Sequence, residues 1–289
     1  MAKYIFSHFE EFEKFKEDSK TAVITDVDGT ISRIAPKPDE AVVTTEMRNI
    51  LTRLADKFKL VAVVSGRSVE DVRKLLGLDN VLYVGNHGLE YMKDGKIQFE
   101  PEVERYIPIV KKAARTLQKD KSCSMEGVFL EDKGVCFCVH YRMCSEPEKT
   151  RKKLLKSIES AVKTANEEGL EKLSIKEGRK VLEIKPQAGY DKGTILEKIV
   201  LKNHVEKALY LGDDITDNDA FCKIKELKDV DGGSALKEHE KDFDGESILV
   251  LSGEIPDYLK KIHLFLLKML MKFKNFLNGL QKIDSPINK

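Results

Sequence analysis

The chain has 289 residues, of which 41% are hydrophobic and 34% are charged, and its formal net charge is +1 at pH 7. This composition is typical of a soluble globular protein with one large or two modest domains, and it lacks the excess of one charge sign that drives general nucleic-acid binding. No apolar run approaches the roughly 18 residues of a membrane-spanning helix, and residues 1–20 lack the apolar core of a secretory signal, so we expect a cytoplasmic protein.

The first elements predicted are an amphipathic helix and a buried strand. Within residues 4–19 phenylalanine recurs at every third position, at Phe6, Phe9, Phe12 and Phe15. This spacing favours a helix packed on a sheet. The apolar run 22–25 then ends in Asp26-Val27-Asp28-Gly29-Thr30, and a short apolar run bounded by turn residues indicates a buried parallel strand. Because ligands bind past the carboxyl ends of such strands, we regard Asp26 and Asp28 as candidates for chemistry.

An Asp-x-Asp pair also opens the calcium-binding loop of an EF-hand. That loop requires a glycine at its sixth position, where this chain has Ile31. The calcium interpretation therefore fails. For the pair taken alone, two ordinary loop acids remain the alternative, because short patterns recur by chance.

Strands and helices continue to alternate after this pair. The sequence predicts a helix over about 44–58, a strand over 60–64, and a helix capped by Ser68. A third strand, 81–84, leads into the segment Gly85-Asn86-His87-Gly88-Leu89-Glu90. Strands that alternate with helices predict a parallel sheet with right-handed crossovers.

The pattern changes in the middle of the chain. The elements expected there are, in order, a helix at about 102–118, strands at 127–130 and 135–142, a helix at about 147–168, and strands at 172–176 and 180–185 joined at Glu177-Gly178. A helix and two strands, repeated, predict a small α+β domain. We therefore divide the chain into a core of residues 1–101 and 187–289 and an inserted cap of residues 102–186.

The alternation then resumes. A helix is predicted over 190–201, a strand over 208–211 that ends in Gly212-Asp213-Asp214, and a last strand over 247–251. A C-terminal helix is predicted over 257–280, with an apolar arc and a lysine-rich arc. A few leucines fall among the lysines. Packing on the sheet explains most of this pattern, and the alternatives are a homodimer surface, a contact with a synthase partner, or weak membrane contact.

Several polar features lie just past a predicted strand or at the start of a helix: Asp26, Asp28, Ser65, Lys192, Asp213, Asp214 and Asp217. In a parallel sheet these places lie at one edge. Acids from two different strands would repel each other unless a cation lay between them, and oxygen ligands suit Mg²⁺. A hydroxyl and a lysine beside that ion would hold the charge of a transferring phosphoryl group. Each feature alone has an ordinary structural explanation, but together they predict a phosphoryl-transfer site.

The order of these motifs resembles the haloacid dehalogenase superfamily of phosphatases. The resemblance implies a doubly wound, Rossmann-like α/β core with an inserted α+β cap. It also implies that Asp26 attacks phosphorus and becomes an aspartyl-phosphate, while Asp28 protonates the departing sugar oxygen and later deprotonates water. Ser65 and Lys192 would bind the phosphoryl oxygens.

The same resemblance implies how Mg²⁺ would be held. Its ligands would be Asp26, the backbone carbonyl of Asp28, and Asp213. Asp214 and Asp217 would orient water and the lysine from behind these ligands.

The cap has a polar sheet face that the sequence predicts independently. Alternate residues of a strand share a face, so His140 and Arg142 point one way, and Glu183 and Lys185 share a face opposite Leu182 and Ile184. Acids and bases on one face can exchange hydrogen bonds with a hydroxyl-rich ligand. The alternative for any single pair is an ordinary solvated face.

Further motifs lie in the cap and its flanks: Val64-Ser65-Gly66-Arg67, 85–90, Glu131-Asp132-Lys133-Gly134, His140-Tyr141-Arg142, 181–186 and Gly212-Asp213-Asp214-x-Thr216-Asp217. These segments resemble trehalose-6-phosphate phosphatases. Together they cover about residues 20–255. The resemblance implies that the substrate is contacted by Arg67, Asn86, His87, Gly88, Glu131, Lys133, Arg142, Glu183 and Lys185. The chain departs from the family pattern at Asn218, where an acid is usual, which removes the basis for a direct role of that position.

The function predicted is Mg²⁺-dependent hydrolysis of trehalose 6-phosphate, a small-molecule sugar phosphate. Other capped phosphatases, acting on mannosyl-3-phosphoglycerate or sucrose phosphate, are alternatives of the same class. A sugar-phosphate sensor without catalysis is an alternative of a different class, and it predicts binding without turnover.

Overall fold

The computed structural model describes residues 3–16, 19–167, 172–229, 243–251, 265–268, 275–277 and 279–280. The chain divides into two compact units, one of residues 1–88 with 191–289 and one of residues 89–190. The insert predicted at 102–186 lies within the second unit. Among the described residues no helix combines the length and the apolar character needed to cross a membrane.

The first unit is built on parallel strands in the order β1-β13-β12-β11-β2-β3-β4. Their bounds are β1 Lys3–Tyr4, β2 Thr21–Thr25, β3 Leu60–Val64, β4 Leu82–Gly85, β11 Lys207–Gly212, β12 Asp244–Leu251 and β13 Phe265–Lys268. All five residues of β2 are buried, as expected for a strand covered on both faces. Because β2 lies between β11 and β3, the loops after these three strands emerge side by side at one edge of the sheet.

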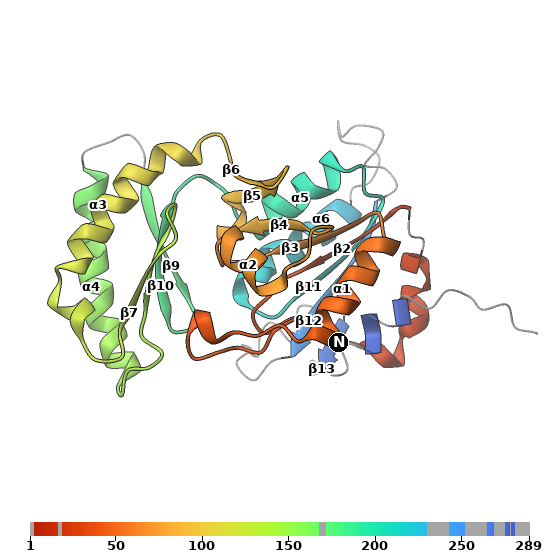
Figure 1. The fold of residues 1–289 in the computed structure, drawn as a ribbon, viewed down its shortest axis with the longest axis horizontal. Helices are drawn as coiled ribbons and strands as arrows, with labels where there is room; N and C mark the ends of the chain where they lie inside the picture. The colour runs from red at the N-terminus through yellow and green to blue at the C-terminus, as the bar shows by residue number, and fades with distance from the viewer. Residues whose placement is uncertain are drawn as a thin grey trace, which may run out of the picture. The chain divides into compact units, whose positions relative to one another are not determined.

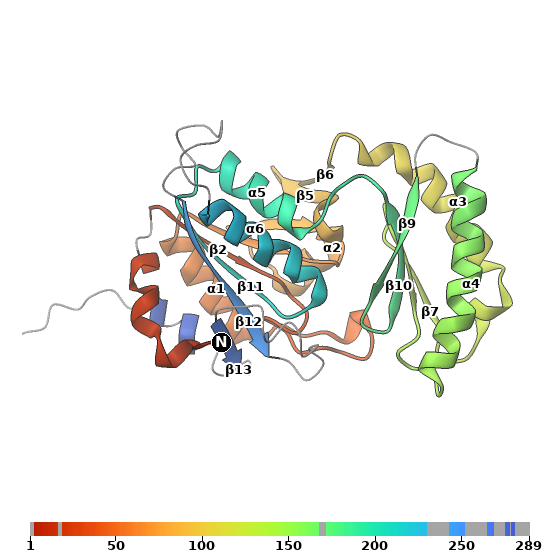
Figure 2. The same ribbon diagram turned by 180° about the vertical axis from the view of Figure 1, so that it is seen from behind.

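Helices cover both faces of this sheet, with α1 and α2 on one face and α5 and α6 on the other (Figure 1; Figure 2 shows the reverse side). Their bounds are α1 Thr45–Lys57, α2 Val69–Leu76, α5 Lys192–Lys202 and α6 Asn218–Lys228. Helices α2 and α5 each begin at a polar cap. The Ser68 side chain accepts a hydrogen bond from the backbone N–H of Asp71, and the Asp191 side chain accepts one from the backbone N–H of Thr194. This arrangement confirms the predicted doubly wound α/β core.

The two ends of the chain differ from the sequence prediction. In place of a helix over 4–19, strand β1 is followed by two 3₁₀ segments, Ile5–Ser7 and Phe9–Lys16, which bury Phe12 and Phe15. The C-terminal helix predicted over 257–280 is wrong at residues 265–268, which form β13. Phe265 is buried there, with its ring 4.7 Å from that of Phe12. A parallel partner on each side of β13 supplies backbone hydrogen bonds that helical periodicity does not reveal.

The rest of that predicted helix lies outside the described residues, except for helical turns at 275–277 and 279–280. Phe276 is buried against Phe9 and Phe12. Part of the apolar arc is therefore used inside the first unit. Within the described residues, nothing supports a dimer or synthase contact through this segment.

The second unit begins with a hairpin that the sequence prediction missed, formed by β5 (Glu90–Lys93) and β6 (Lys96–Phe99). Asp94 and Gly95 connect the strands, both with positive φ (51° and 73°). Asp-Gly is a strong signal for a two-residue hairpin turn, so this element could have been found from the sequence. A 3₁₀ turn, Val103–Tyr106, then leads into helix α3.

The remainder of the second unit is a four-stranded antiparallel sheet in the order β7-β8-β10-β9 with two helices on one face (Figure 2). The bounds are α3 Ile107–Gln118, β7 Phe129–Asp132, β8 Phe137–His140, α4 Pro147–Asn166, β9 Leu173–Gly178 and β10 Val181–Pro186. Phe137, Val139, Leu182 and Ile184 face the helices and are buried. The predicted hairpin is present, but its turn residues are Arg179-Lys180 and not Glu177-Gly178, which belong to β9.

Candidate active site

The loop after β2 carries Asp26 and Asp28 and approaches the loop after β11 very closely. The backbone N–H of Asp26 donates to the carbonyl of Leu211 (2.8 Å). Gly29 has φ = +87°, and a Cβ atom built there would lie only 1.7 Å from Oδ2 of Asp213. Only glycine therefore allows the Asp213 carboxylate to lie against this loop. The structure therefore brings together Asp26 and Asp213, the acids at the ends of two different strands that were predicted to share a site.

Lys192, the first residue of α5, connects these loops. Its side chain is buried, and its Nζ donates to Oδ1 of Asp26 (2.8 Å) and to Oδ1 of Asp217 (2.6 Å). The Asp191 cap fixes the start of the helix, so the lysine emerges from a rigid position. The structure thus joins Lys192 to two of the predicted acids across 166 and 25 residues of sequence.

Asp217 organises the loop after β11. Its Oδ1 accepts hydrogen bonds from Lys192 and from the hydroxyl of Tyr210 (2.7 Å), and its Oδ2 accepts from the backbone N–H groups of Asp213 and Asp214 (2.9 Å each). Each oxygen therefore already receives two donors. This carboxylate is suited to orienting Lys192 and the loop.

Tyr210 is the member of this network that the sequence analysis missed. It lies within β11 and is fully buried, and its only polar group reaches Asp217. A tyrosine inside a predicted buried strand needs a hydrogen-bond partner for its hydroxyl. This requirement could have identified Tyr210 as a member of a polar network from the sequence.

The charges of this cluster are unbalanced. Burial raises the pKa of Asp26 well above its usual value, although Lys192 opposes this shift. Burial would also raise the pKa of Asp217, but Lys192, Tyr210 and backbone donors hold it below its usual value. The pKa of Lys192 is raised, because the two carboxylates outweigh its desolvation. The cluster therefore holds three neighbouring carboxylates, counting Asp213, and the one ammonium of Lys192, which pairs with two of them, so a divalent cation would complete the charge balance.

The donor set fits a hard cation. Asp26, Asp213 and Asp217 each offer a carboxylate oxygen, and these atoms lie within 4.8 Å of one another. Because Asp217 is saturated with hydrogen bonds, Asp26 and Asp213 are the carboxylates able to bind the ion. Oxygen-only ligands of this kind suit Mg²⁺, so the residues present are compatible with the predicted metal.

The loops after β3 and β4 form the other side of this edge. Ser65 is buried, and its hydroxyl accepts a hydrogen bond from the backbone N–H of Arg67 (3.1 Å). The N–H of Asn86 donates to the carbonyl of Arg67 (2.7 Å), and the N–H of His87 donates to that of Ser65 (2.9 Å). A Cβ at Gly66 would lie 2.7 Å from the His87 ring, so the two loops are in tight contact.

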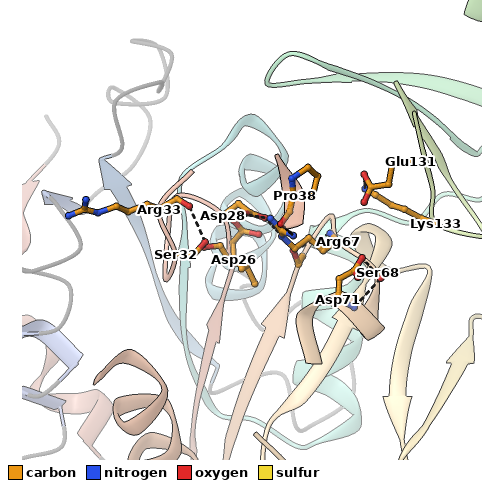
Figure 3. Close-up of polar contacts among 12 residues, drawn as sticks. Asp26, Asp28, Ser32, Arg33, Pro38, Arg67, Ser68, Asp71, Glu131 and Lys133 are labelled. Carbon is orange, nitrogen blue, oxygen red and sulfur yellow. Dashed lines mark hydrogen bonds and ion pairs between the residues drawn. The ribbon is translucent and has the colours of Figure 1, made fainter. Parts of the chain in front are cut away.

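Three of the residues predicted to bind substrate have distinctive environments here. Asn86 is fully buried with φ = +48°, and neither atom of its side-chain amide has a hydrogen-bond partner among the described residues. The Arg67 guanidinium forms two hydrogen bonds with the Asp28 carboxylate, from Nε to Oδ2 (2.6 Å) and from Nη2 to Oδ1 (2.8 Å) (Figure 3). Its Nη1 donates to the carbonyl of Pro38 (2.8 Å). Gly88 has φ = +104°, and its Cα lies against Ile195.

In the second unit, the open face of the sheet gathers a polar cluster. Cross-strand register places Glu131, Cys138 and Glu183 in one row across β7, β8 and β10. Lys133 lies 3.5 Å from Oε1 of Glu183 and 3.9 Å from Oε2 of Glu131, which also contacts Nε2 of His140 (2.8 Å). The side chains of Glu131, Lys133 and Glu183 are at most 16% exposed, so this face is not an ordinary solvated one.

Burial opposes the charge on Lys133, but Cys138, Glu183 and Glu131 hold its pKa well above the usual value, so the side chain stays an ammonium. Two further residues that were predicted to contact the substrate, Lys185 and Arg142, donate hydrogen bonds to backbone carbonyls. Lys185 donates to the carbonyl of Tyr190 (3.1 Å), and Arg142 donates to the carbonyl of Arg179 in the β9–β10 turn (3.0 Å).

The chain is similar to several known proteins. Residues 24–247 match the family model described as trehalose-phosphatase. Trehalose-phosphate phosphatase B of Arabidopsis thaliana is 30% identical over 233 residues, covering 75% of this chain and 60% of that protein. Trehalose-phosphate phosphatase of Mycobacterium avium is 32% identical over 243 residues, covering 81% of this chain and 59% of that protein. The chain therefore matches about three fifths of the length of these two relatives.

Solved structures show the same fold. The C-terminal domain of Candida albicans trehalose-6-phosphate phosphatase superposes with a TM-score of 0.73 at 21% identity, covering 93% of this chain and 94% of that one. A haloacid dehalogenase-like hydrolase from Bacteroides thetaiotaomicron gives a TM-score of 0.58 at 14% identity, covering 91% and 97%. The family model spans every strand-end residue of the site described above, and this chain accordingly belongs to the trehalose-phosphatase family.

Proposed function

We propose that this protein is a Mg²⁺-dependent phosphoric monoester hydrolase that converts trehalose 6-phosphate to trehalose and phosphate through an aspartyl-phosphate. The observation that carries this proposal is the buried network in which Lys192 links Asp26 to Asp217 while Asp213 lies against the Asp26 loop. The names of the relatives supply the substrate.

The chemistry divides among the residues of the first unit. Asp26, whose carboxylate is oriented by Lys192, attacks phosphorus, and the bond from phosphorus to the sugar oxygen breaks. Asp28 gives a proton to that oxygen and then takes one from the water that attacks the aspartyl-phosphate, which releases phosphate and restores Asp26. Ser65 and Lys192 hold the phosphoryl oxygens. Asp26, Asp213 and the backbone carbonyl of Asp28 would hold Mg²⁺, which would neutralise the phosphoryl charge when bound.

The second unit would select the sugar. Glu131 and Glu183 can accept hydrogen bonds from sugar hydroxyls, and Lys133 can donate to them. These side chains are already oriented by one another on a rigid sheet, which reduces the entropy that binding must remove. In the first unit, the buried amide of Asn86 offers both a donor and an acceptor to a ligand.

The direct test is phosphate release from trehalose 6-phosphate, sucrose phosphate and mannosyl-3-phosphoglycerate, each with and without Mg²⁺. We expect the fastest turnover with trehalose 6-phosphate, loss of activity with a chelator, and its return when Mg²⁺ is restored. Equal or faster turnover of another sugar phosphate would reject the substrate. Binding of trehalose 6-phosphate without phosphate release would favour the sensor.

The sugar contacts are tested by Glu183→Gln. Because a charge-assisted hydrogen bond to a hydroxyl contributes about 1.5–3 kcal/mol, we expect the KM for trehalose 6-phosphate to rise by about tenfold or more. Hydrolysis of p-nitrophenyl phosphate, which has no sugar, should change little. The matched control is Glu177→Gln on the neighbouring strand, which removes only an exposed ion pair with Arg151. An unchanged KM in Glu183→Gln would remove this residue from the sugar site.

A further inference from the structure

Arg67 makes a set of contacts that differs from the substrate-binding role its motif suggests. Two parallel hydrogen bonds of 2.6 and 2.8 Å join its guanidinium to both carboxylate oxygens of Asp28, and a third of 2.8 Å reaches the carbonyl of Pro38 (Figure 3). The donors Nε, Nη1 and Nη2 are thus all engaged within the first unit. Bidentate pairs of this kind specify orientation as well as energy.

The backbone of Arg67 is as firmly held as its side chain. Its N–H donates to the Ser65 hydroxyl, and its carbonyl accepts from the N–H of Asn86 (2.7 Å). The arginine side chain is only 14% exposed, whereas Asp28 is 35% exposed. A flexible surface pair contributes little, but here a fixed guanidinium determines where a more accessible carboxylate points.

We infer that Arg67 is a positioning residue: it orients the Asp28 carboxylate for proton transfer, and through the carbonyl of Pro38 it anchors the 3₁₀ segment Pro38–Glu40. This inference rests on the proposed function, in which Asp28 hands a proton to the leaving oxygen and later takes one from water. These proton transfers depend on the two separate hydrogen bonds that Nε and Nη2 donate to the two oxygens of Asp28. One oxygen of Asp28 can leave its partner to meet the substrate while the other stays held.

The test compares Arg67→Ala and Arg67→Lys with the wild-type protein in Mg²⁺, using trehalose 6-phosphate and p-nitrophenyl phosphate. Because misplacing a reacting group by about 1 Å can cost about 100-fold in rate, we expect kcat to fall by about that factor in Arg67→Ala. The KM for trehalose 6-phosphate should stay within about threefold of wild type, since no ground-state contact is lost. Arg67→Lys should restore only part of kcat, because an ammonium cannot form the two parallel bonds.

Two readouts separate positioning from a merely structural role. Added guanidinium should restore part of the kcat of Arg67→Ala, and it should restore none in Asp28→Asn. In the Asp28→Asn background, Arg67→Ala should cost no more than about a further twofold, because residues that act through one another are not additive. The control is Arg73→Ala on α2, whose partner Asp79 is 94% exposed, and it should retain wild-type kinetics.

Opposite results would overturn the inference. A KM for trehalose 6-phosphate that rises tenfold or more at unchanged kcat would make Arg67 a substrate ligand, and full additivity with Asp28→Asn would place its action elsewhere. A crystal structure of Arg67→Ala gives an answer that does not depend on turnover: a displaced or multiply oriented Asp28 carboxylate supports the inference, and an unmoved one rejects it. A wild-type protein inert toward every phosphate ester would reject the proposed function, while this crystallographic comparison would still decide the role of Arg67.

Discussion

Replacing Asp26 with Asn should abolish phosphate release while the protein stays folded. The amide keeps the size of the side chain and can still accept a hydrogen bond from Lys192, but it cannot attack phosphorus. Loss of a nucleophile that acts within a catalytic unit can cost about 10⁶-fold, so we expect kcat to fall by more than about 10³-fold. Steady-state phosphate release measures the loss, and thermal unfolding establishes that the fold persists.

A second result should accompany this one if Asp26 carries the phosphoryl group. Wild-type protein quenched with acid during turnover of labelled substrate should retain label on the chain, and Asp26→Asn should retain none. The control is Asp229→Asn, at the exposed end of α6, which should behave as wild type. Activity that survives in Asp26→Asn would show that the nucleophile has been assigned to the wrong residue.

Replacing Lys192 with Met should damage both activity and stability. The lysine is the ammonium between Asp26 and Asp217, and its removal leaves two buried carboxylates without their shared partner. Breaking a buried ion pair by removing one member costs about 3–5 kcal/mol, so we expect the free energy of unfolding in urea to fall by that amount. Turnover should fall as well, because the carboxylate of Asp26 loses its orientation and the phosphoryl oxygens lose a donor.

A double variant separates these two effects. Adding Asp217→Asn to Lys192→Met removes one of the stranded charges, so stability should recover in part while activity stays lost. Lys202→Met, at the exposed end of the same helix, is the matched control and should change neither property. Stability unaffected by Lys192→Met would contradict the buried charge network.

Side-chain partnerships in this site were decided by the fold alone. Arg67 and Asp28 are 39 residues apart in the sequence. No local sequence pattern predicts that the guanidinium after one strand will form hydrogen bonds with the carboxylate after a neighbouring strand. Likewise, the hydroxyl of Tyr210 and the saturation of Asp217 by four donors depend on how a turn folds back over its own strand. Such contacts are set by packing between elements, which a periodicity argument does not contain.

The sequence by itself was sufficient to determine the doubly wound core and the strand-end acids. Buried parallel strands such as β2 read as short apolar runs, and the catalytic candidates follow at their carboxyl ends, where parallel topology must gather them. Tertiary structure alone decided that residues 265–268 complete the sheet as β13 and do not continue a helix, because hydrogen bonds to β12 and β1 outweigh a local helical pattern. It also decided which donor each carboxylate meets, since those distances depend on residues far apart in the chain.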